Sequence, residues 1–426
     1  MAHGRATDTP ALGDRVASCL WVGQVLSTLG SQVSFFVIPT IAITYLHASE
    51  GDVGLLNAVG SVAFPVLYLV AGPFVGRWRL LRVMYASDLA RAGAFAVIPI
   101  AVATGHASMS LLYGVALVSS VFSVLFDLAY SAVLPRLVGG EKLQKQNGRL
   151  QLAFTMARLV GPPIGGLMVR VAGVVASLML NSLSFVASVI SVVIAGRIVP
   201  GIDAPADVAG RLTRSDLVSG FDFLWQIPIL RRATIASSLH NLGMSAARTA
   251  LLLFLYRGLD LSAAEAGLLI AAEALGATVG ATRSTQVIRR LGVGGSLLLG
   301  PLESILWLLI PVAAIGHGPA LIAIILFVSA IWLPIWNITI TTLRQEIVPP
   351  DMLVRVHAAS RTLVLGTIPI GSLLGGIGAG LLASRFGDLW GLAIAVALGA
   401  LVASTALQQL ANRDLLRVKD YADCRP

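Results

Sequence analysis

Charged side chains are scarce in this chain of 426 residues, since Asp, Glu, Lys and Arg together make up only 12% of it. An ordinary soluble domain carries about 25% charged residues, so this composition excludes one. Several runs contain no charge and are longer than the roughly 20 apolar residues that cross a bilayer. They are residues 16–46, 53–76, 171–196, 362–384 and 389–412. The sequence therefore predicts an all-α membrane protein.

Cysteine and histidine are also rare. Cys19 and Cys424 are the two cysteines, and their spacing predicts neither a disulfide nor a metal site. No HExxH or GxxxxGK[ST] motif occurs, and the six scattered histidines do not combine with a nucleophile and an orienting group. We therefore expect no enzyme activity, no metal, no cofactor and no use of ATP through a P-loop.

Two longer uncharged runs, 92–126 and 304–343, are each broken by a short polar turn and so contribute to two spans each. Counting spans that are interrupted by single charges as well, we predict twelve transmembrane helices. Their expected bounds are 17–46, 53–76, 83–104, 108–134, 150–170, 175–196, 233–256, 263–286, 293–315, 319–343, 362–383 and 389–411.

The longest polar stretch, 197–228, lies between the sixth and the seventh of these spans. We therefore expect an N-terminal six-helix bundle at 1–196, a cytoplasmic central loop at 197–228, and a C-terminal six-helix bundle with a cytoplasmic tail at 229–426. The remaining loops are short and leave no room for a soluble catalytic domain.

The net charge of +9 follows a pattern along the chain. Of the 30 Lys and Arg residues, 24 lie in the N-terminus, the even-numbered loops and the C-terminus. The exceptions are Arg170, Arg257 and Arg385 in odd-numbered loops and Arg91, Arg158 and Arg248 within spans. Positive charge marks the cytoplasmic side of a membrane. Both termini are therefore expected on the cytoplasmic side of the cell membrane. No contiguous basic patch occurs, which argues against a nucleic-acid partner.

The two halves of the chain look related. Residues 138–166 align with residues 348–376 at a constant offset of 210, and both stretches contain the same GxxxGG pattern. Chance matching of glycines between apolar helices is the alternative, but the coincidence favours duplication and hence two pseudo-symmetric bundles.

The N-terminal copy of this pattern reads ARLVGPPIGG and supplies Gly161, Pro162, Gly165 and Gly166. GxxxG puts two glycines on one helix face, where a neighbouring backbone can approach closely. Static packing and a seam between moving helices both fit this pattern.

Twelve spans in two halves, with GPPIGG in the fifth span, resemble the major facilitator superfamily and its antiporter motif, which is associated with exporters. Residues 20–42, 87–93, 219–231 and 343–387 resemble the branch that holds the enterobactin exporter and macrolide efflux proteins. The resemblance implies export of a small molecule by alternating access. We expect a monomer whose partners are this substrate, protons and the lipid bilayer.

One stretch departs from the superfamily pattern. The loop between the second and third spans usually reads G-x-x-x-D-R-x-G-R-R, whereas this chain has GPFVGRWRLLR, which keeps Gly72 and Arg77 but puts Gly76 at the acidic position. The charge contacts that this loop normally makes must therefore be weaker here or built from other residues.

Charges within spans form two groups. The N-terminal group contains Asp88, Arg91, Asp127 and Arg158, all about 8–12 Å from the inner surface by helix rise. These four residues either hold helices together as static ion pairs or form a network that rearranges during transport. The resemblance implies that Arg77 competes with Arg158 for Asp127.

The C-terminal group contains Arg248, Glu273 and Glu303. Both glutamates lie near the midplane, where transporters place substrate and coupling sites. Arg248 is expected to reach Glu273, and this pair is the first candidate for proton coupling. The alternatives are a static pair for Glu273 and packing behind the cavity for Glu303.

Polar and aromatic residues on the spans that line the cavity in this fold are weaker candidates for substrate contact. They are Gln24, Gln32, Asn57, Trp332, Trp336 and Asn337. His240 lies well inside a span, where a lone histidine more often hydrogen-bonds locally.

The sequence thus favours a proton-coupled exporter of a medium-sized amphipathic compound such as a drug, an antibiotic or a siderophore. A facilitator or a lysophospholipid transporter of the same fold is the alternative, and a membrane enzyme is the third and least supported class.

Overall fold

The computed structural model describes residues 9–70, 78–138, 140–199, 214–316 and 318–411. Every regular element within these ranges is helical, which confirms the all-α class. The elements are α1 (Thr9–Thr44), α2 (Glu50–Val70), α3 (Leu80–Ala103), α4 (Met109–Leu137), α5 (Gly140–Ile198), α6 (Arg214–Gln226), α7 (Pro228–Leu253), η2 (Phe254–Gly258), α8 (Ala263–Trp307), η3 (Ile310–Ile315), α9 (Gly318–Ala330), α10 (Trp332–Ile347), α11 (Pro350–Ser404) and α12 (Ala406–Leu410).

Eight helical stretches among the described residues are long and apolar enough to cross a membrane. They are Gly13–Thr44, Glu50–Val70, Leu80–Ala103, Met109–Leu137, Gly148–Ile198, Ala263–Ile315, Gly318–Ile347 and Arg355–Leu410. Since a span takes about 20 residues, the stretches of more than fifty residues are too long for one span each. The count of twelve spans stays a prediction.

One glycine interrupts each of the helices α5, α8 and α11. Gly173, Gly292 and Gly387 have φ of 80°, 72° and 78°, with extended ψ. This backbone conformation is essentially restricted to glycine, because a Cβ would clash with the backbone. Each of the three helices therefore consists of two helical segments that meet at its glycine.

The packing of α5 on α1 shows that the chain reverses at Gly173. In the first segment, Gly161 packs on Gln32 and Gly165 packs further along α1, on Phe36 and Val37, so this segment runs parallel to α1. In the second segment the order is inverted, since Ser184 packs on Gly30 and the later residue Ser191 packs on the earlier Gly23.

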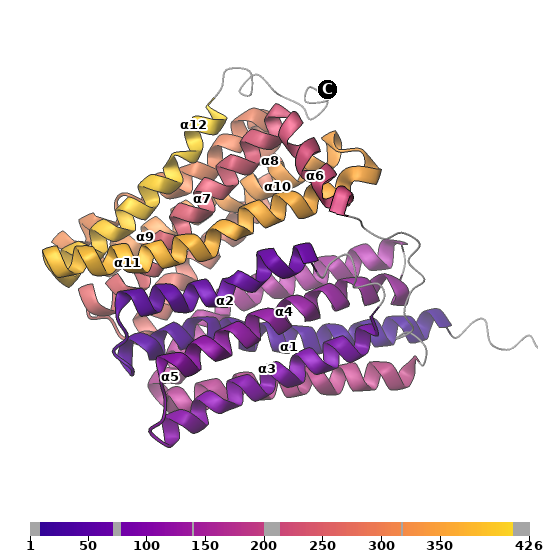
Figure 1. Ribbon diagram of the computed structural model, residues 1–426, viewed down its shortest axis with the longest axis horizontal. Helices are drawn as coiled ribbons and strands as arrows, with labels where there is room; N and C mark the ends of the chain where they lie inside the picture. The colour runs from indigo at the N-terminus through magenta and orange to yellow at the C-terminus, as the bar shows by residue number, and fades with distance from the viewer. Residues whose placement is uncertain (1–8, 71–77, 139, 200–213, 317, 412–426) are drawn as a thin grey trace, which may run out of the picture. The chain divides into compact units, whose positions relative to one another are not determined.

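The described residues fall into two compact units. The first comprises Met1–Ile41 and Val70–Arg211, and the second Ala42–Leu69 and Leu212–Pro426. Within the first unit, α3 lies beside α4 and α5 (Figure 1). Its core is built from α1, α3, α4 and α5 and includes Leu20, Leu80, Met84, Phe126 and Val192.

In the second unit, α11 packs along α7, and α8 packs against α9 and α10 (Figure 1). One apolar cluster of this unit includes Leu224, Val293, Trp336, Leu343 and Val356. The helix α2 belongs to the second unit by its contacts and runs antiparallel to α11. Gly54 packs on Gly376 near the start of α2, and the Arg361 guanidinium lies over Tyr68 near its end.

Candidate functional site

Three predicted charges of the second unit meet in one cluster, which we call the Arg248 cluster. Arg248 of α7 donates through Nη1 to both carboxylate oxygens of Glu273, at 2.6 Å each. Its Nη2 donates to Oε1 of Glu303 at 2.9 Å. The two glutamates come from the two segments of α8, on either side of Gly292. One guanidinium thus holds two carboxylates.

His240, which the sequence analysis expected only to hydrogen-bond locally, also belongs to this cluster. It is buried, and its Nε2 lies 3.4 Å from Oε2 of Glu303. Its ring meets Trp336 edge-on, with the ring centroids 5.0 Å apart. His240 precedes Arg248 by eight residues on α7, about two helical turns, and this spacing was the available signal. A single sequence does not show that Glu303 lies opposite both residues.

Aromatic side chains enclose the Arg248 cluster. The Arg248 guanidinium lies over the ring of Trp307, 5.1 Å from its centroid. Trp307 is fully buried and donates through Nε1 to Ser329 at 3.1 Å. Trp336 is also buried and packs on Gly300. These rings place the charges in surroundings of low polarity, where electrostatic interactions are stronger than in water.

The cluster is more accessible at one end than at the other. The side chains of Arg248 and Glu273 are 36% and 12% exposed, whereas that of Glu303 is 1% exposed. The charges also do not balance, because two ionised carboxylates exceed one guanidinium by one negative charge. Net charge is costly in such surroundings, so this set of groups is neutral when it holds one additional proton. The excess carboxylate thus lies in a cluster that is partly open at Arg248 and Glu273.

Two of the four charged residues in the predicted N-terminal group form an ion pair with each other. Asp88 and Arg91 form a buried ion pair one turn apart on α3. The Arg91 guanidinium lies over the rings of Phe126 and Phe185, 4.9 Å and 4.5 Å from their centroids. Opposite charge and two aromatic faces thus surround Arg91, as expected for a static pair that holds α3, α4 and α5 together.

Within the described residues, no ion pair joins the other two charges of the predicted N-terminal group to Asp88 or Arg91. Asp127 is half-buried on α4 and Arg158 is exposed on α5. Arg158 forms no ion pair with a carboxylate in the part of the chain that the structure describes. Arg77 lies outside the described residues, so its expected competition for Asp127 stays a prediction.

The glycines of the antiporter-like motif lie in a tight helix seam. A Cβ built on Gly161 would lie 2.6 Å from Cβ of Gln32, and one on Gly165 would lie 3.3 Å from the carbonyl oxygen of Val33. Pro162 and Gly166 are buried beside them. The first segment of α5 therefore approaches the backbone of α1 closely.

The predicted substrate contacts lie in different surroundings. Asn57 donates to the Thr249 hydroxyl at 3.2 Å. Gln24 is buried, Gln32 and Trp332 are half-buried, and Asn337 is exposed. Trp336 is 2% exposed, because it packs between His240 and Gly300. It therefore belongs to the interior of the second unit.

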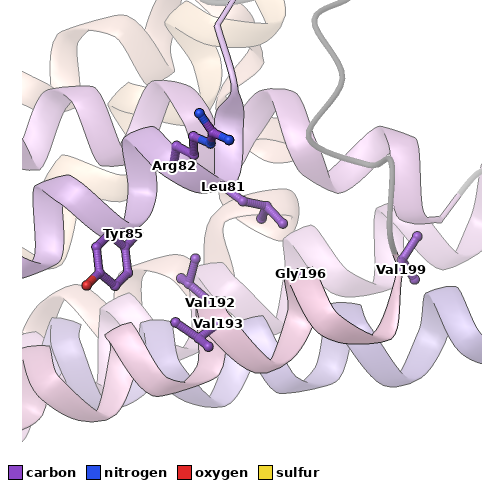
Figure 2. A pocket seen from close by; sticks show the side chains of 7 residues that line it. All are labelled: Leu81, Arg82, Tyr85, Val192, Val193, Gly196 and Val199. Atoms are coloured by element: carbon purple, nitrogen blue, oxygen red, sulfur yellow. The ribbon is translucent and has the colours of Figure 1, made fainter.

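A surface pocket in the first unit has a lining that contains none of these candidates. It is formed by α3 and the second segment of α5, and Figure 2 shows Arg82 and Tyr85 on one side and three valines on the other. Its lining residues are Leu81, Arg82, Tyr85, Val192, Val193, Gly196 and Val199. None of them was a predicted site residue.

Comparison with known proteins agrees with this fold. A family model described as transmembrane secretion effector matches residues 7–423. The multidrug efflux pump Tap of Mycolicibacterium fortuitum is 26% identical over 366 residues, which cover 82% of this chain and 85% of the pump. The enterobactin exporter EntS of Shigella boydii serotype 18 is 26% identical over 342 residues, 80% of each chain.

Solved structures show the same architecture. A bacterial homologue of the iron transporter ferroportin, in an inward-facing state, matches with a TM-score of 0.73 and 16% identity, over 93% of this chain and 99% of the other. The nucleoside transporter NupG matches with a TM-score of 0.70 and 13% identity, over 93% of this chain and 100% of the other. At these identities the likeness shows the fold alone.

Proposed function

Since this chain belongs to the transmembrane secretion effector family of the major facilitator superfamily and is a multi-pass membrane transporter, we propose that it is a proton-coupled exporter. Its substrate in this proposal is a medium-sized amphipathic compound such as a drug, an antibiotic or a siderophore. The export direction is supported by the two relatives that span most of its length, a multidrug efflux pump and an enterobactin exporter.

The observation that carries proton coupling is the single guanidinium of Arg248 between Glu273 and Glu303. A like charge disfavours a second ionised carboxylate nearby, whereas an opposite charge favours it. A change in the distance between α7 and α8 alters this balance and with it the affinity for a proton. In our proposal Glu273, the more accessible carboxyl, takes up the proton from outside and releases it inside while substrate leaves.

The membrane topology that goes with this function has twelve spans. Each glycine turn in α5, α8 and α11 separates two spans, α9 and α10 form one, and α7 forms the seventh. Both termini and the central loop at 197–228 face the cytoplasm of the cell, with six-helix bundles at 1–196 and 229–426. The support is the distribution of basic residues.

Uphill transport in proteoliposomes tests the proposal. Ethidium and enterobactin serve as trial substrates, and a pH indicator trapped in the lumen reports proton movement. An exporter of this type moves one of them against its gradient while protons flow the opposite way, and a protonophore stops both. Transport that is only downhill and insensitive to the protonophore would favour the facilitator or lysophospholipid transporter.

A further inference from the structure

A second charged cluster, which we call the Arg344 cluster, lies where α10 ends and α11 begins. Arg344 is half-buried near the end of α10. Its Nη1 lies 3.1 Å from Nδ1 of His357, and its Nη2 donates to the hydroxyl of Ser360 at 2.9 Å. Ser360 is buried and lies 3.4 Å from the hydroxyl of Thr234 on α7. Two neutral side chains of α11 thus hold the guanidinium, and α7 contacts one of them through Thr234.

The hydrogen bond to Arg344 sets the tautomer of His357. An arginine can only donate, so Nδ1 of His357 accepts, and the remaining proton of the neutral ring sits on Nε2. That leaves one N–H donor available for another partner. The Arg344 cluster therefore offers several donors, and its remaining acceptors are the hydroxyls of Ser360 and Thr234.

Arg361 adds a second positive charge. It is exposed on α11, next to Ser360, and its guanidinium carbon lies 5.8 Å from the ring centroid of Tyr68. Its charge acts on both Arg344 and His357. Two guanidinium groups and an imidazole therefore gather at one end of α10 and α11.

Three other arginines among the described residues pair with carboxylates. Arg91 pairs with Asp88, Arg248 with two glutamates, and Arg257 with Glu50. No carboxylate among the described residues lies within ion-pair distance of Arg344 or Arg361.

The nearest acid in the sequence does not change this balance. Glu346 follows Arg344 by two residues and is exposed, and residues at this spacing do not face each other on a helix. A partly buried positive charge without an opposite charge is unfavourable. Binding of an anion would offset this cost.

We propose that Arg344, His357 and Arg361 form a binding site for a phosphate group. A guanidinium presents two parallel N–H donors that match two oxygens of such an anion, and Nε2–H of His357 and Arg361 supply further donors. The phosphate comes either from the headgroup of an anionic phospholipid or from a free phosphate compound. The site lies near the ends of two predicted spans, at the face predicted to be cytoplasmic, where anionic lipids are enriched. The site does not depend on proton coupling or on export.

Thermal unfolding of the purified full chain tests this site. In one arm, the protein in nanodiscs of phosphatidylcholine is titrated with inorganic phosphate against sodium chloride of equal ionic strength. In the other, nanodiscs of phosphatidylcholine are compared with nanodiscs that also contain phosphatidylglycerol. Tryptophan fluorescence gives the Tm, which rises when a ligand binds the folded state.

We expect a rise in Tm in at least one arm. A rise in the first arm identifies a free phosphate as sufficient, and a rise only in the second identifies the lipid headgroup. Arg344→Gln and Arg361→Gln should each weaken the response by about tenfold in apparent affinity, since each removes a charge-assisted hydrogen bond. Arg283→Gln and Arg289→Gln, exposed basic residues of α8, are the matched controls and should respond like the unchanged protein.

An unchanged Tm in both arms would overturn the proposal. So would equal responses in the unchanged protein and in the Arg361→Gln variant. Arg361 is exposed, so its replacement tests the site even if Arg344→Gln does not fold. Because binding is measured without transport, this result is distinguishable from a failure of the proposed export function.

Discussion

Gly161 of α5 packs on Gln32 of α1, and the C-terminal half of the chain repeats this contact. Gly371 of α11 packs on Leu242 of α7, and both residues lie 210 positions after Gly161 and Gln32. The same offset relates Gly165 and Phe36 to Gly375 and Ala246. The duplication inferred from the GxxxGG pattern thus extends to the helix face that the glycines contact.

The seam between α1 and α5 predicts the effect of enlarging its glycines. Gly161→Leu or Gly165→Leu would drive a side chain into α1, where even a Cβ is too close. Since overpacking costs typically about 1–3 kcal/mol, we expect a lower Tm and loss of most transport, with membrane insertion retained.

Gly93→Leu and Gly114→Leu are matched controls for the seam, because nothing lies within 4 Å of a Cβ at either position. They should leave the Tm and transport nearly unchanged. Normal transport in both Gly161→Leu and Gly165→Leu would contradict the seam.

Replacing Gly387 should lower stability through backbone strain, without any side-chain clash. The φ of 78° at Gly387 is strained for any residue with a Cβ, although no atom lies within 4 Å of a Cβ at this position. Gly387→Ala should therefore cost about 1–3 kcal/mol of stability. Gly378→Ala, in the same helix and also in open space, should be neutral or slightly stabilising. Chemical denaturation of both variants in detergent gives the comparison, and equal stabilities would refute the assigned turn.

Much of the fold follows from local patterns that one sequence displays. Uncharged runs predict helices because a bilayer cannot satisfy unpaired backbone groups, and GxxxGG predicts close helix contact. The sequence also suggested that Arg248 and Glu273 are within reach, because both lie toward the middle of neighbouring spans.

The rest of the site depends on helix rotation, which periodicity determines poorly in spans that are apolar on all sides. Packing behind the cavity was the alternative for Glu303, and His240 was set aside as a lone histidine. In the structure Glu303 accepts a hydrogen bond from Arg248, and His240 lies beside Glu303. The same limit applies to Trp336, whose burial against His240 cannot be inferred from its spacing to Trp332.

The proposed topology predicts which loops are accessible from outside the cell. With Cys19 and Cys424 replaced, single cysteines at Asp388 and Arg289, both exposed, should label differently. A membrane-impermeant maleimide should label the Asp388→Cys variant in intact cells, and the Arg289→Cys variant only after permeabilisation. Labelling of Arg289→Cys from outside would refute the twelve-span topology. Arg211, in the central loop, gives a second cytoplasmic position and lies outside the described residues.

Replacing Asp127 should impair the conformational change of the transporter, whereas replacing Glu273 should impair proton coupling. Asp127 lies on α4, in the first unit, and the resemblance to the superfamily associates an acid at this level with the conformational change. Asp127→Asn should therefore lower both uphill export and downhill exchange. Asp88→Asn should mainly lower the Tm, since it leaves the buried charge of Arg91 uncompensated. Exchange at the normal rate in Asp127→Asn would leave this residue without the proposed role.

The two glutamates of the Arg248 cluster should differ in their effect on coupling. Glu273→Gln leaves Arg248 with the buried carboxylate of Glu303, so no accessible carboxyl remains in the cluster to take up a proton. It should abolish uphill export and leave downhill exchange measurable. Glu303→Gln leaves Arg248 paired with Glu273 and keeps the accessible carboxyl. Uphill export by this variant should therefore persist. Glu346→Gln, which replaces an exposed carboxyl of α10, is the control and should match the unchanged protein.

The measurement is the rate of uphill export in proteoliposomes as a function of external pH. Normal uphill export by Glu273→Gln would place the proton site elsewhere, with Asp127 the next residue to test.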